Sequence, residues 1–572
     1  MEYSAIFHDM DKRFSYAVDK DLFVIRVQVK KDDMKEVILH YEDKYIPMER
    51  KDTRMTLPMK KVATSQFHDY YEAQIQMHLI CLRYYFEFTD TQGEKIYYGN
   101  YEFSKECITN RDRMFDCPQN LREEEMFEVP QWAANKVVYQ IFPSRFAATQ
   151  PVDKELWYKA PITPMDDLHG NLRGIIEHLD YIKDLGIDVV YLTPIFKSNS
   201  CHKYDTIDYY QVDPSFGTTE DLKELVQKSH ERGMKVVLDA VYNHTGREFF
   251  AFQDILEKGE KSKYLDWYFI DELPPRGEWG EIPNFKCFGY YGGMPKLNLK
   301  NPEVEKYITD VACYWIKECD IDGWRLDVGD EISHFFWKNF RKAIKAVKKD
   351  MLIIGEIWHY AGDFLEGDEW DTVMNYPFYL NLIDLLADEK ITVSQFVQNL
   401  GYLKGRLHKN CYPLMWNLID SHDTARFLHL CNDNKKKQHL AAAFQLLLPG
   451  MPMIYYGDEY AMPGANDPDC RRGMYWDEEY QDKEMYEWYK RLIQVRKSHA
   501  CIVEGELAGS VTEDEEGTVV LIRKNGEETI AMIFNCSSSA KKFNEYTQKY
   551  NLLTENTFDG NVEGFDAAVI VL

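Results

Sequence analysis

The sequence lacks the features that mark disulfide scaffolds, zinc proteins and membrane proteins. Its 12 cysteines are scattered over 572 residues with no C-x-x-C pair, which indicates free thiols in a reducing cytoplasm. No apolar run approaches the length of a membrane span. The N-terminus has no basic stretch followed by an apolar one, so we expect no signal peptide. These absences predict a cytoplasmic protein with no membrane partner.

Positive charge is also in short supply. Lys and Arg number 68 against 95 Asp and Glu, which leaves a formal net charge of -27. A surface of that sign repels phosphate backbones, so we expect no nucleic-acid partner. The hydrophobic share of 45% is ordinary for a folded protein. Because the length exceeds what one hydrophobic core usually holds, we predict several domains.

Both ends of the chain are predicted to be β-sandwiches. In residues 1–120, apolar and polar residues alternate in short runs such as 22–29 and 82–88, separated by turn-like segments. This pattern is typical of antiparallel strands. The acidic segment 120–125 looks like the exit linker of this domain. Strand-like runs return in residues 505–572, which we expect to form a second β-sandwich.

Between these ends, short apolar strands alternate with amphipathic helices. Eight such units predict an α/β fold, a closed (β/α)8 TIM barrel over residues 130–504. The segment 246–300 follows the third strand and is too long for an ordinary loop, so it is expected to be a small inserted domain. The predicted strands are 136–142, 188–195, 235–241, 323–328, 351–357, 371–376, 414–419 and 451–458.

Local signals place two helices of this region. An apolar stripe predicts a single helix over 172–185 that ends at Gly186. Thr218 and Asp221 form a capping-box-like start for the next helix, which is expected to end near Gly233.

Polar side chains stand at the carboxyl ends of four predicted strands. Because these ends converge on one face of a barrel, we expect Asp327, Glu356 and Asp423 to meet in one cleft. Arg325 lies two residues before Asp327 and faces the same side of its strand, where it would hold Asp327 ionised and oriented. The four segments are 239–244, 323–327, 353–358 and 420–426.

Paired carboxyl groups in one cleft suit the cleavage of a glycosidic bond. One group protonates the leaving oxygen and the other attacks the anomeric carbon, and in retaining enzymes the two lie about 5–5.5 Å apart. Like charges at that range raise one pKa, which keeps the acid protonated near neutral pH. The competing interpretation is structural, since a single Asp at a strand end is more often a helix cap or an ion-pair partner. Four such segments in order favour catalysis.

These four segments resemble, in order and spacing, the signature regions of the α-amylase family, glycoside hydrolase family 13. Residues 294–298, Met-Pro-Lys-Leu-Asn, resemble the fifth-region signature of its neopullulanase, cyclomaltodextrinase and maltogenic amylase subfamily. Residues 1–120 resemble the family 34 carbohydrate-binding-like module of that subfamily. Supporting segments are 139–143, 455–459 and 467–472. The resemblance implies retaining hydrolysis of α-1,4-glucosidic bonds in cyclodextrins, pullulan and short maltodextrins, with α-1,6 cleavage and transglycosylation left open.

The resemblance also implies roles for individual side chains. Asp327 would be the nucleophile, Glu356 the acid/base and Asp423 the stabiliser of the transition state. Asp239 and Asn243 would support the site. The substrate contacts would be Arg325, His244, His422 and a stacking Tyr204 at the cleavage subsite, Trp358, Phe288 and Glu331 on the leaving side, and Asp467 and Arg471 on the non-reducing side.

Two departures from the subfamily pattern bear on chemistry. Residues 328–331 read Val-Gly-Asp-Glu where the subfamily usually has Val-Ala-Asn-Glu, which leaves the preference between α-1,4, α-1,6 and transfer chemistry open. The loop 147–153 offers one carboxylate, Asp153, where the subfamily often has an Asn/Asp-rich calcium loop. Because calcium takes several oxygen ligands, we expect this structural calcium site to be lost and no cofactor to be required.

Two alternatives stay open at this point. One is an oligo-1,6-glucosidase or glucanotransferase of the same family, which usually lacks the N-terminal module. The other is a non-catalytic glucan-binding relative, which could have lost carboxylates. The resemblance further implies a homodimer in which the module of one protomer covers the cleft of the other. The expected partners are α-glucan oligosaccharides and cyclodextrins.

Overall fold

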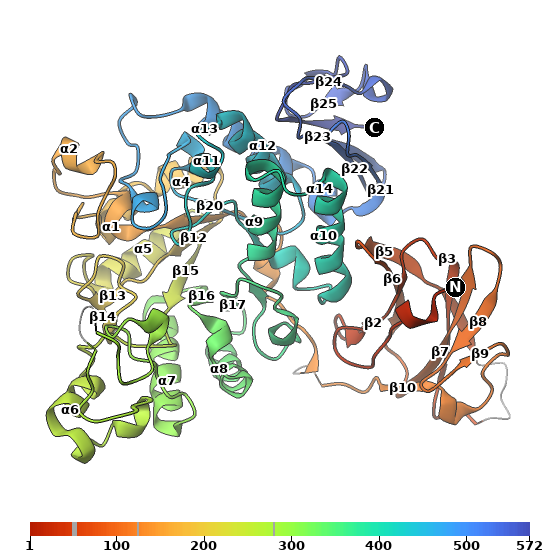
Figure 1. Cartoon of the computed structure of the whole chain (residues 1–572), viewed down its shortest axis with the longest axis horizontal. Coiled ribbons are helices and arrows are strands. Elements are labelled where there is room, and N and C mark those ends of the chain that lie inside the picture. The colour runs from red at the N-terminus through yellow and green to blue at the C-terminus, as the bar shows by residue number, and fades with distance from the viewer. Residues whose placement is uncertain (48–53, 123–124, 278–280) are drawn as a thin grey trace. The chain divides into compact units, whose positions relative to one another are not determined.

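The computed structural model describes residues 1–47, 54–122, 125–277 and 281–572 (Figure 1). Glu123 and Glu124 of the predicted exit linker lie outside the described residues. The chain forms two compact units. The first comprises Met1–Val129, Tyr360–Asp371 and Ile391–Tyr412, and the second comprises Pro130–His359, Thr372–Lys390 and Pro413–Leu572.

The first unit contains the predicted N-terminal β-sandwich, in which neighbouring strands pair antiparallel. Strand order is β1-β2-β6-β5 in one sheet and β4-β3-β7-β8-β9 in the other, with β10 paired to β7. Alternate residues of β2 and β7 enter a common apolar core, as the period of two requires. The strands are β1 (Ser15–Ala17), β2 (Leu22–Lys30), β3 (Met34–Asp43), β4 (Met55–Pro58), β5 (Lys60–Thr64), β6 (His68–Gln76), β7 (Cys81–Asp90), β8 (Lys95–Tyr98), β9 (Phe103–Ser104) and β10 (Phe115–Pro118).

Two segments from the predicted barrel region also belong to this first unit. Helix α10 (Val393–Arg406) packs against β5. The buried Arg26 pairs with Glu72 at 2.5 Å and donates from Nη1 to the carbonyl oxygens of Gly405 and Leu407, each at 2.9 Å. Domain boundaries predicted from the sequence do not assign these two segments to the first unit. The acceptors of the buried Arg26 guanidinium lie far from it in sequence, so local patterns do not reveal the contact.

The second unit is built on eight parallel strands in the order β18-β17-β16-β15-β12-β11-β20-β19 (Figure 1). Met374 bridges to Trp416 in parallel, which joins the two ends of this order and closes the barrel. Each of the eight predicted strands contains one observed strand. These are β11 (Val138–Ile141), β12 (Val189–Leu192), β15 (Lys235–Ala240), β16 (Gly323–Leu326), β17 (Leu352–Gly355), β18 (Thr372–Val373), β19 (Trp416–Asn417) and β20 (Met451–Tyr455).

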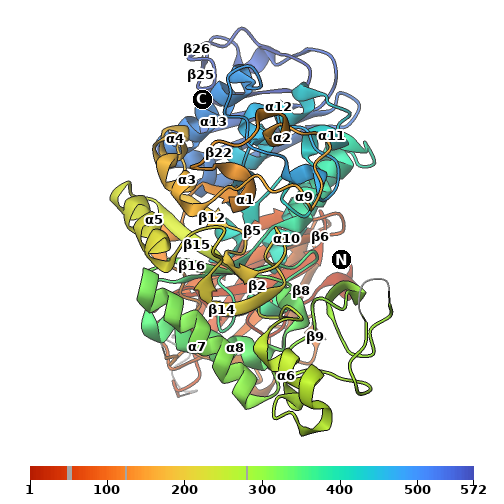
Figure 2. The same ribbon diagram turned by 90° about the vertical axis from the view of Figure 1, so that its left-hand side faces the viewer.

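Helices cover the outside of these strands. α5 (Thr219–Glu231), α7 (Pro302–Cys319) and α8 (His334–Val347) lie side by side (Figures 1 and 2). The predicted capping box of Thr218 and Asp221 is present at the start of α5. In α7 the buried residues recur at helical spacing, among them Val304, Ile308, Val311 and Trp315, so one stripe faces the barrel.

The helix predicted over 172–185 is two helices, α3 (Leu172–Glu177) and α4 (Leu179–Leu185). His178 separates them, with φ -104° and ψ 8°, and its ring Nδ1 bonds the Gly174 carbonyl at 2.7 Å. The apolar stripe continues across this break, because Leu172, Ile175, Leu179 and Leu185 are all buried. Periodicity alone therefore could not reveal it. The predicted end at Gly186 is confirmed, with φ 100°.

The segment 246–300 holds α6 (Phe250–Lys258) and several short 3-10 turns. Isolated bridges join it to the barrel, including one between His244 and Lys296. After α13 (Lys483–Ser498) and α14 (Cys501–Glu504), the chain forms sheets again. The larger one has the order β21-β22-β23-β28-β25-β26, and β24 pairs with β27. Within the described ranges, no helix is long and apolar enough to span a membrane.

The C-terminal strands are β21 (Glu506–Glu513), β22 (Thr518–Asn525), β23 (Glu528–Asn535), β24 (Lys541–Lys542), β25 (Tyr550–Asn551), β26 (Asn556–Thr557), β27 (Asn561–Val562) and β28 (Asp566–Val571). Their shared core includes Val520, Ala531, Ile533 and Ile570. Barrel helix α12 (Lys435–Leu447) contacts β28 and β23, and Phe444 stacks on Phe534 with ring centroids 4.2 Å apart. These sheets therefore pack on the barrel within the second unit.

Candidate active site

The guanidinium of Arg325, in β16, is fully buried and faces four carboxyl groups. Its Nη1 lies 3.0 Å from Asp239 Oδ1 and 2.9 Å from Asp327 Oδ1. Its Nη2 lies 2.8 Å from Glu356 Oε2 and 3.8 Å from Asp423 Oδ2. The structure thus brings together the three candidate catalytic carboxylates and Asp239 around one cation.

The barrel ladder fixes where these side chains begin. Asp239 and Arg325 are direct parallel partners in β15 and β16. Past the strand ends, the Asp327 N–H donates to the Ala240 carbonyl at 3.1 Å, and the Glu356 N–H donates to the Leu326 carbonyl at 3.0 Å. Since strand-type hydrogen bonding continues through both residues, their backbones are held as rigidly as the barrel itself.

Four carboxyl groups around one guanidinium perturb each other's protonation. Burial raises the pKa of Asp327 well above its ordinary value, assisted by Glu356, Asp239 and Asp423 and opposed by Arg325. Burial likewise raises the pKa of Asp239 to about 6, against the lowering effect of Arg325. The cluster therefore binds a proton more readily than separate aspartates do, as one carboxyl pair in a glycosidase must.

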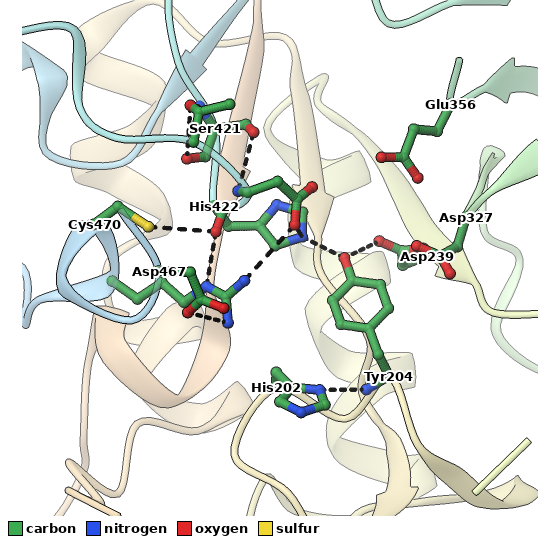
Figure 3. A network of polar contacts seen from close by, with 12 residues as sticks. His202, Tyr204, Asp239, Asp327, Glu356, Ser421, His422, Asp467 and Cys470 are labelled. Carbon is green, nitrogen blue, oxygen red and sulfur yellow. Dashed lines mark hydrogen bonds and ion pairs between the residues drawn. The ribbon is translucent and has the colours of Figure 1, made fainter. Parts of the chain in front are cut away.

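Tyr204 and His422 form a polar chain beside Asp239 (Figure 3). The Tyr204 hydroxyl lies 3.0 Å from Asp239 Oδ2 and 2.5 Å from His422 Nε2. On the other side of the ring, the Gln140 side-chain amide donates to His422 Nδ1 at 2.8 Å. Burial lowers the pKa of His422 well below its ordinary value, so the ring is neutral with its proton on Nε2. That nitrogen also lies 3.2 Å from Asp423 Oδ1.

His244 is buried behind the Tyr204 loop. Its Nε2 lies 3.1 Å from the Tyr204 carbonyl oxygen, and burial lowers the pKa of His244 to about 3. The ring stacks on Phe288, with centroids 5.2 Å apart and planes 15° apart. Phe288 is half-buried rather than part of the core, so one part of its ring remains open to a ligand.

Trp358 is the most open aromatic of the candidate site, with 41% of its surface exposed. Its indole N–H donates to Glu356 Oε1 at 3.2 Å, and its ring stacks on Tyr376 at 3.9 Å between centroids. On the same face of the barrel, at positions distant in sequence, Asn243 donates to Glu331 Oε2 at 3.1 Å, and Lys296 Nζ lies 3.5 Å from the same oxygen. These contacts hold Glu331 through its carboxylate.

Asp467 lies on the other side of His422 from Asp327 (Figure 3), and it forms an ion pair with Arg471. Arg471 Nη1 lies 2.8 Å from Asp467 Oδ1, and Arg471 Nε donates to the His422 carbonyl at 2.8 Å. Arg471 Nη2 lies 3.7 Å from Asp423 Oδ1. The pair thus connects to the carboxyl cluster through Asp423.

Three further residues of the site were missed in the sequence. Tyr191 donates to Asp239 Oδ2 at 2.7 Å, Gln140 holds His422, and Tyr376 supports Trp358. Tyr376 ends the predicted strand 371–376, so the strand-end rule could have flagged it. Tyr191 and Gln140 lie inside apolar runs, where an aromatic or an amide reads as packing.

The loop that the resemblance associates with calcium does not offer a suitable set of ligands. Its one carboxylate, Asp153, caps α2 (Lys154–Trp157) by accepting the Glu155 N–H at 2.8 Å. The Thr149 hydroxyl accepts from Asn171 at 3.2 Å. Within the part of the chain that the structure describes, no cluster of three or more His, Cys, Asp or Glu could hold a metal ion.

Comparison with known proteins identifies two matching family models. Residues 140–505 match the α-amylase catalytic domain and residues 1–119 the α-amylase N-terminal Ig-like domain. The chain is 43% identical over 544 residues to a cyclomaltodextrinase of Geobacillus thermopakistaniensis (strain MAS1), covering 94% of this chain and 92% of that one. It is 38% identical to an intracellular maltogenic amylase of Bacillus subtilis, with 94% and 91% covered. A solved cyclomaltodextrinase structure matches with a TM-score of 0.94, 37% identity and 100% of each chain covered.

Proposed function

Because this chain belongs to the α-amylase family of glycoside hydrolases, we propose that it hydrolyses α-1,4-glucosidic bonds in cyclodextrins, pullulan and short maltodextrins with retention of configuration. The observation that carries the proposal is the convergence of Asp327, Glu356 and Asp423 on the buried Arg325. The alternatives were an oligo-1,6-glucosidase or glucanotransferase of the same family and a non-catalytic glucan-binding relative, and this similarity does not favour them.

Asp327 acts as the nucleophile. Its Oδ1 is held by Arg325 at 2.9 Å, while its buried Oδ2 has no hydrogen-bond partner among the described residues. Oδ2 is therefore the oxygen that forms a bond to the anomeric carbon as the glycosidic C–O bond breaks. The contact with Arg325 orients the carboxylate and favours its ionised form, the form that attacks, against the opposing effect of burial.

Glu356 acts as the general acid and then as the general base. Its Oε2 accepts the Val328 N–H at 2.9 Å and its Oε1 the Trp358 indole N–H at 3.2 Å, so both oxygens are positioned. In the first step Glu356 gives its proton to the leaving oxygen. In the second it takes a proton from the water that hydrolyses the glycosyl-enzyme. Trp358 links this group to the leaving side, where its open face can stack on a sugar.

Asp423 and the neighbouring imidazole bind the sugar at the cleavage point. The Asp423 side chain keeps 27% of its surface exposed, so its oxygens can accept hydrogen bonds from sugar hydroxyls. His422 presents a neutral ring whose Nε2 N–H lies against the Tyr204 hydroxyl and Asp423 Oδ1, so a sugar hydroxyl bound by Asp423 can share this donor. Tyr204, parallel to His422 with planes 2° apart, offers the stacking surface under the same sugar.

Product chromatography tests this proposal. We expect β-cyclodextrin and short maltodextrins to be consumed faster than starch, and pullulan to be cut at its α-1,4 bonds to panose. Pullulan cut only at α-1,6 bonds would identify a debranching enzyme instead. An enzyme that hydrolyses none of these four substrates would reject the proposal.

Two further properties complete the proposal: a homodimer and a cytoplasmic location. In the dimer, residues 1–120 of one protomer would cover the cleft of its partner and exclude long chains by steric closure. Deletion of residues 1–120 should weaken dimerisation and shift preference toward starch. A monomer by light scattering with starch as its best substrate would refute the dimer.

The cytoplasmic location is supported by the free thiols and by the intracellular relative, and fractionation of the host cells tests it.

A further inference from the structure

A second pair of buried carboxyl groups anchors the loop that carries His422 and Asp423. Asp420 begins this loop and Asp458 follows strand β20. Both side chains are 1% exposed. Neither residue is in the proposed catalytic or substrate-binding set, so their burial needs a separate explanation.

Arg426 and one backbone amide account for half of the oxygens of this pair. Arg426 Nη1 donates to Asp458 Oδ1 at 2.9 Å, and the Phe427 N–H donates to Asp420 Oδ2 at 2.7 Å. The other two oxygens, Asp420 Oδ1 and Asp458 Oδ2, are buried and receive no N–H or O–H from any described residue. The two side chains nevertheless lie within hydrogen-bonding reach of each other. Two ionised carboxylates can only accept, so this contact requires a proton between them.

The charges around the pair lead to the same conclusion. Arg426 is a cation that acts on both aspartates, and Glu459 adds a further negative charge beside Asp458. Glu459 already accepts the hydroxyls of Tyr139 and Tyr181 at 2.6 and 2.7 Å. Burial is the main cause that raises the pKa of Asp420 and of Asp458. The titratable and charged groups facing the pair are Arg426, Glu459, Tyr139, Tyr379 and Tyr489.

The pair is tied to the active site through backbone carbonyls. Arg426 also donates from Nη1 to the Tyr456 carbonyl at 2.7 Å and from Nε to the Cys470 carbonyl at 3.0 Å. In turn, Cys470 Sγ and Arg471 Nε both donate to the His422 carbonyl, at 3.4 and 2.8 Å (Figure 3). The chain around Arg426, Tyr456 and Cys470 is thus joined by hydrogen bonds, and two donors from residues 470–471 end on the backbone carbonyl of His422.

We propose that Asp420 and Asp458 share one proton at neutral pH and that this proton-sharing pair is a positioning device for His422 and Asp423. The link to catalysis rests on the roles proposed above for those two residues, whereas the shared proton itself does not. Loss of the proton would leave two carboxylates repelling each other in a buried space. The loop would then move, and with it the groups that bind the sugar.

Infrared spectroscopy tests the shared proton directly. Asp420→Asn and Asp458→Asn each replace one carboxyl by an amide that can donate to the remaining carboxylate, so each variant keeps the contact. We expect each to lose one protonated-carboxyl carbonyl band from the wild-type spectrum at neutral pH. Unchanged carboxyl bands in both variants would refute the shared proton, whatever their activity. This outcome is independent of the proposed function.

Kinetics test the positioning role. Asp458→Ala removes the contact, and a loop displacement of about 1 Å should lower kcat by about 100-fold. KM should change much less, because binding at distant subsites is unaffected. Asp458→Asn should restore kcat to the wild-type order of magnitude, since it keeps the loop in place. Equal kcat in wild type, Asp458→Asn and Asp458→Ala would refute the positioning role. If Asp458→Ala does not fold, a large loss of kcat in folded Asp458→Asn refutes it instead.

Discussion

Each end of the barrel contains a cluster of charged groups around a buried side chain, and the balance of charge differs between the two clusters. At the carboxyl ends of the strands, four carboxyl groups surround the single cation of Arg325. At the opposite end of the barrel, Asp322 directly precedes β16. Its carboxylate lies 2.7 Å from His230 Nε2, 2.9 Å from Lys235 Nζ and 3.0 Å from Lys348 Nζ. One cluster has an excess of acid and the other an excess of base.

The pKa values follow this difference. Burial raises the pKa of Asp327, whereas His230, Lys348 and Lys235 lower the pKa of Asp322 to about 2 in spite of its burial. An ionised Asp322 therefore stabilises the fold, and an ionised Asp327 costs stability. The barrel therefore holds its destabilising carboxylate in the candidate active site and its stabilising carboxylate at the opposite end.

Removal of a candidate catalytic carboxylate should produce the largest effect. We expect Asp327→Asn and Glu356→Gln each to lower kcat by about four orders of magnitude or more. Asp327→Asn should also unfold at the same temperature as wild type or a higher one, because it removes a repelled carboxylate. Steady-state kinetics on maltotriose and calorimetry measure the two effects. Near wild-type turnover in either variant would refute its assignment.

Asp330→Asn is the matched control for those variants. It removes a carboxyl group from the 328–331 segment beside the cleft and introduces the residue that the resembled subfamily usually has there. We expect turnover within one order of magnitude of wild type, with any change appearing in the choice between α-1,4 and α-1,6 bonds. A loss as large as that of Asp327→Asn would show that negative charge in general, rather than the nucleophile, is required.

The opposite cluster should respond in the opposite way. We expect Asp322→Asn to lower the free energy of unfolding by about 2–3 kcal/mol while leaving kcat unchanged at temperatures where the protein is folded. Asp320→Asn is the control, because Asp320 also pairs with Lys348 at 2.8 Å but has 69% of its side chain exposed. Its effect should not exceed about 0.5 kcal/mol. Equal losses in the two variants would contradict the importance of burial.

The stability supplied by Asp322 should depend on pH. Its folded pKa of about 2 lies below the unfolded value of about 3.9, so the stabilisation is fully present above about pH 5 and is lost as pH falls through about 2. Denaturant unfolding across acid pH should therefore show the wild type and Asp322→Asn converging as the solution becomes more acidic. A constant difference in unfolding free energy would show that Asp322 acts through packing rather than charge.

Removal of calcium should have the smallest effect. Because Asp153 is engaged in capping α2, we expect activity and melting temperature to be unchanged by excess chelator. Complete loss of activity with chelator, restored by added calcium, would show that a metal supports the carboxyl cluster by a route outside the loop 147–153.

The sequence predicted the eight strands and the catalytic candidates because both follow simple rules. Strands of a parallel barrel are short apolar runs, and their carboxyl ends carry polar residues such as Asp327 and Glu356. It did not predict the break at His178, since the apolar stripe runs through it, nor the assignment of α10 to the first unit. The assignment of α10 depends on contacts distant in sequence, such as that of Arg26 with Gly405, which local patterns do not encode.

The anomeric form of the first products tests most directly whether Asp327 is a nucleophile. A covalent glycosyl-enzyme on Asp327 inverts the anomeric carbon once, and hydrolysis of that intermediate inverts it again. Proton NMR during the first turnovers on an α-linked substrate should therefore show the α-anomer before mutarotation. Initial release of the β-anomer would mean that water attacks directly, and it would contradict the role assigned to Asp327.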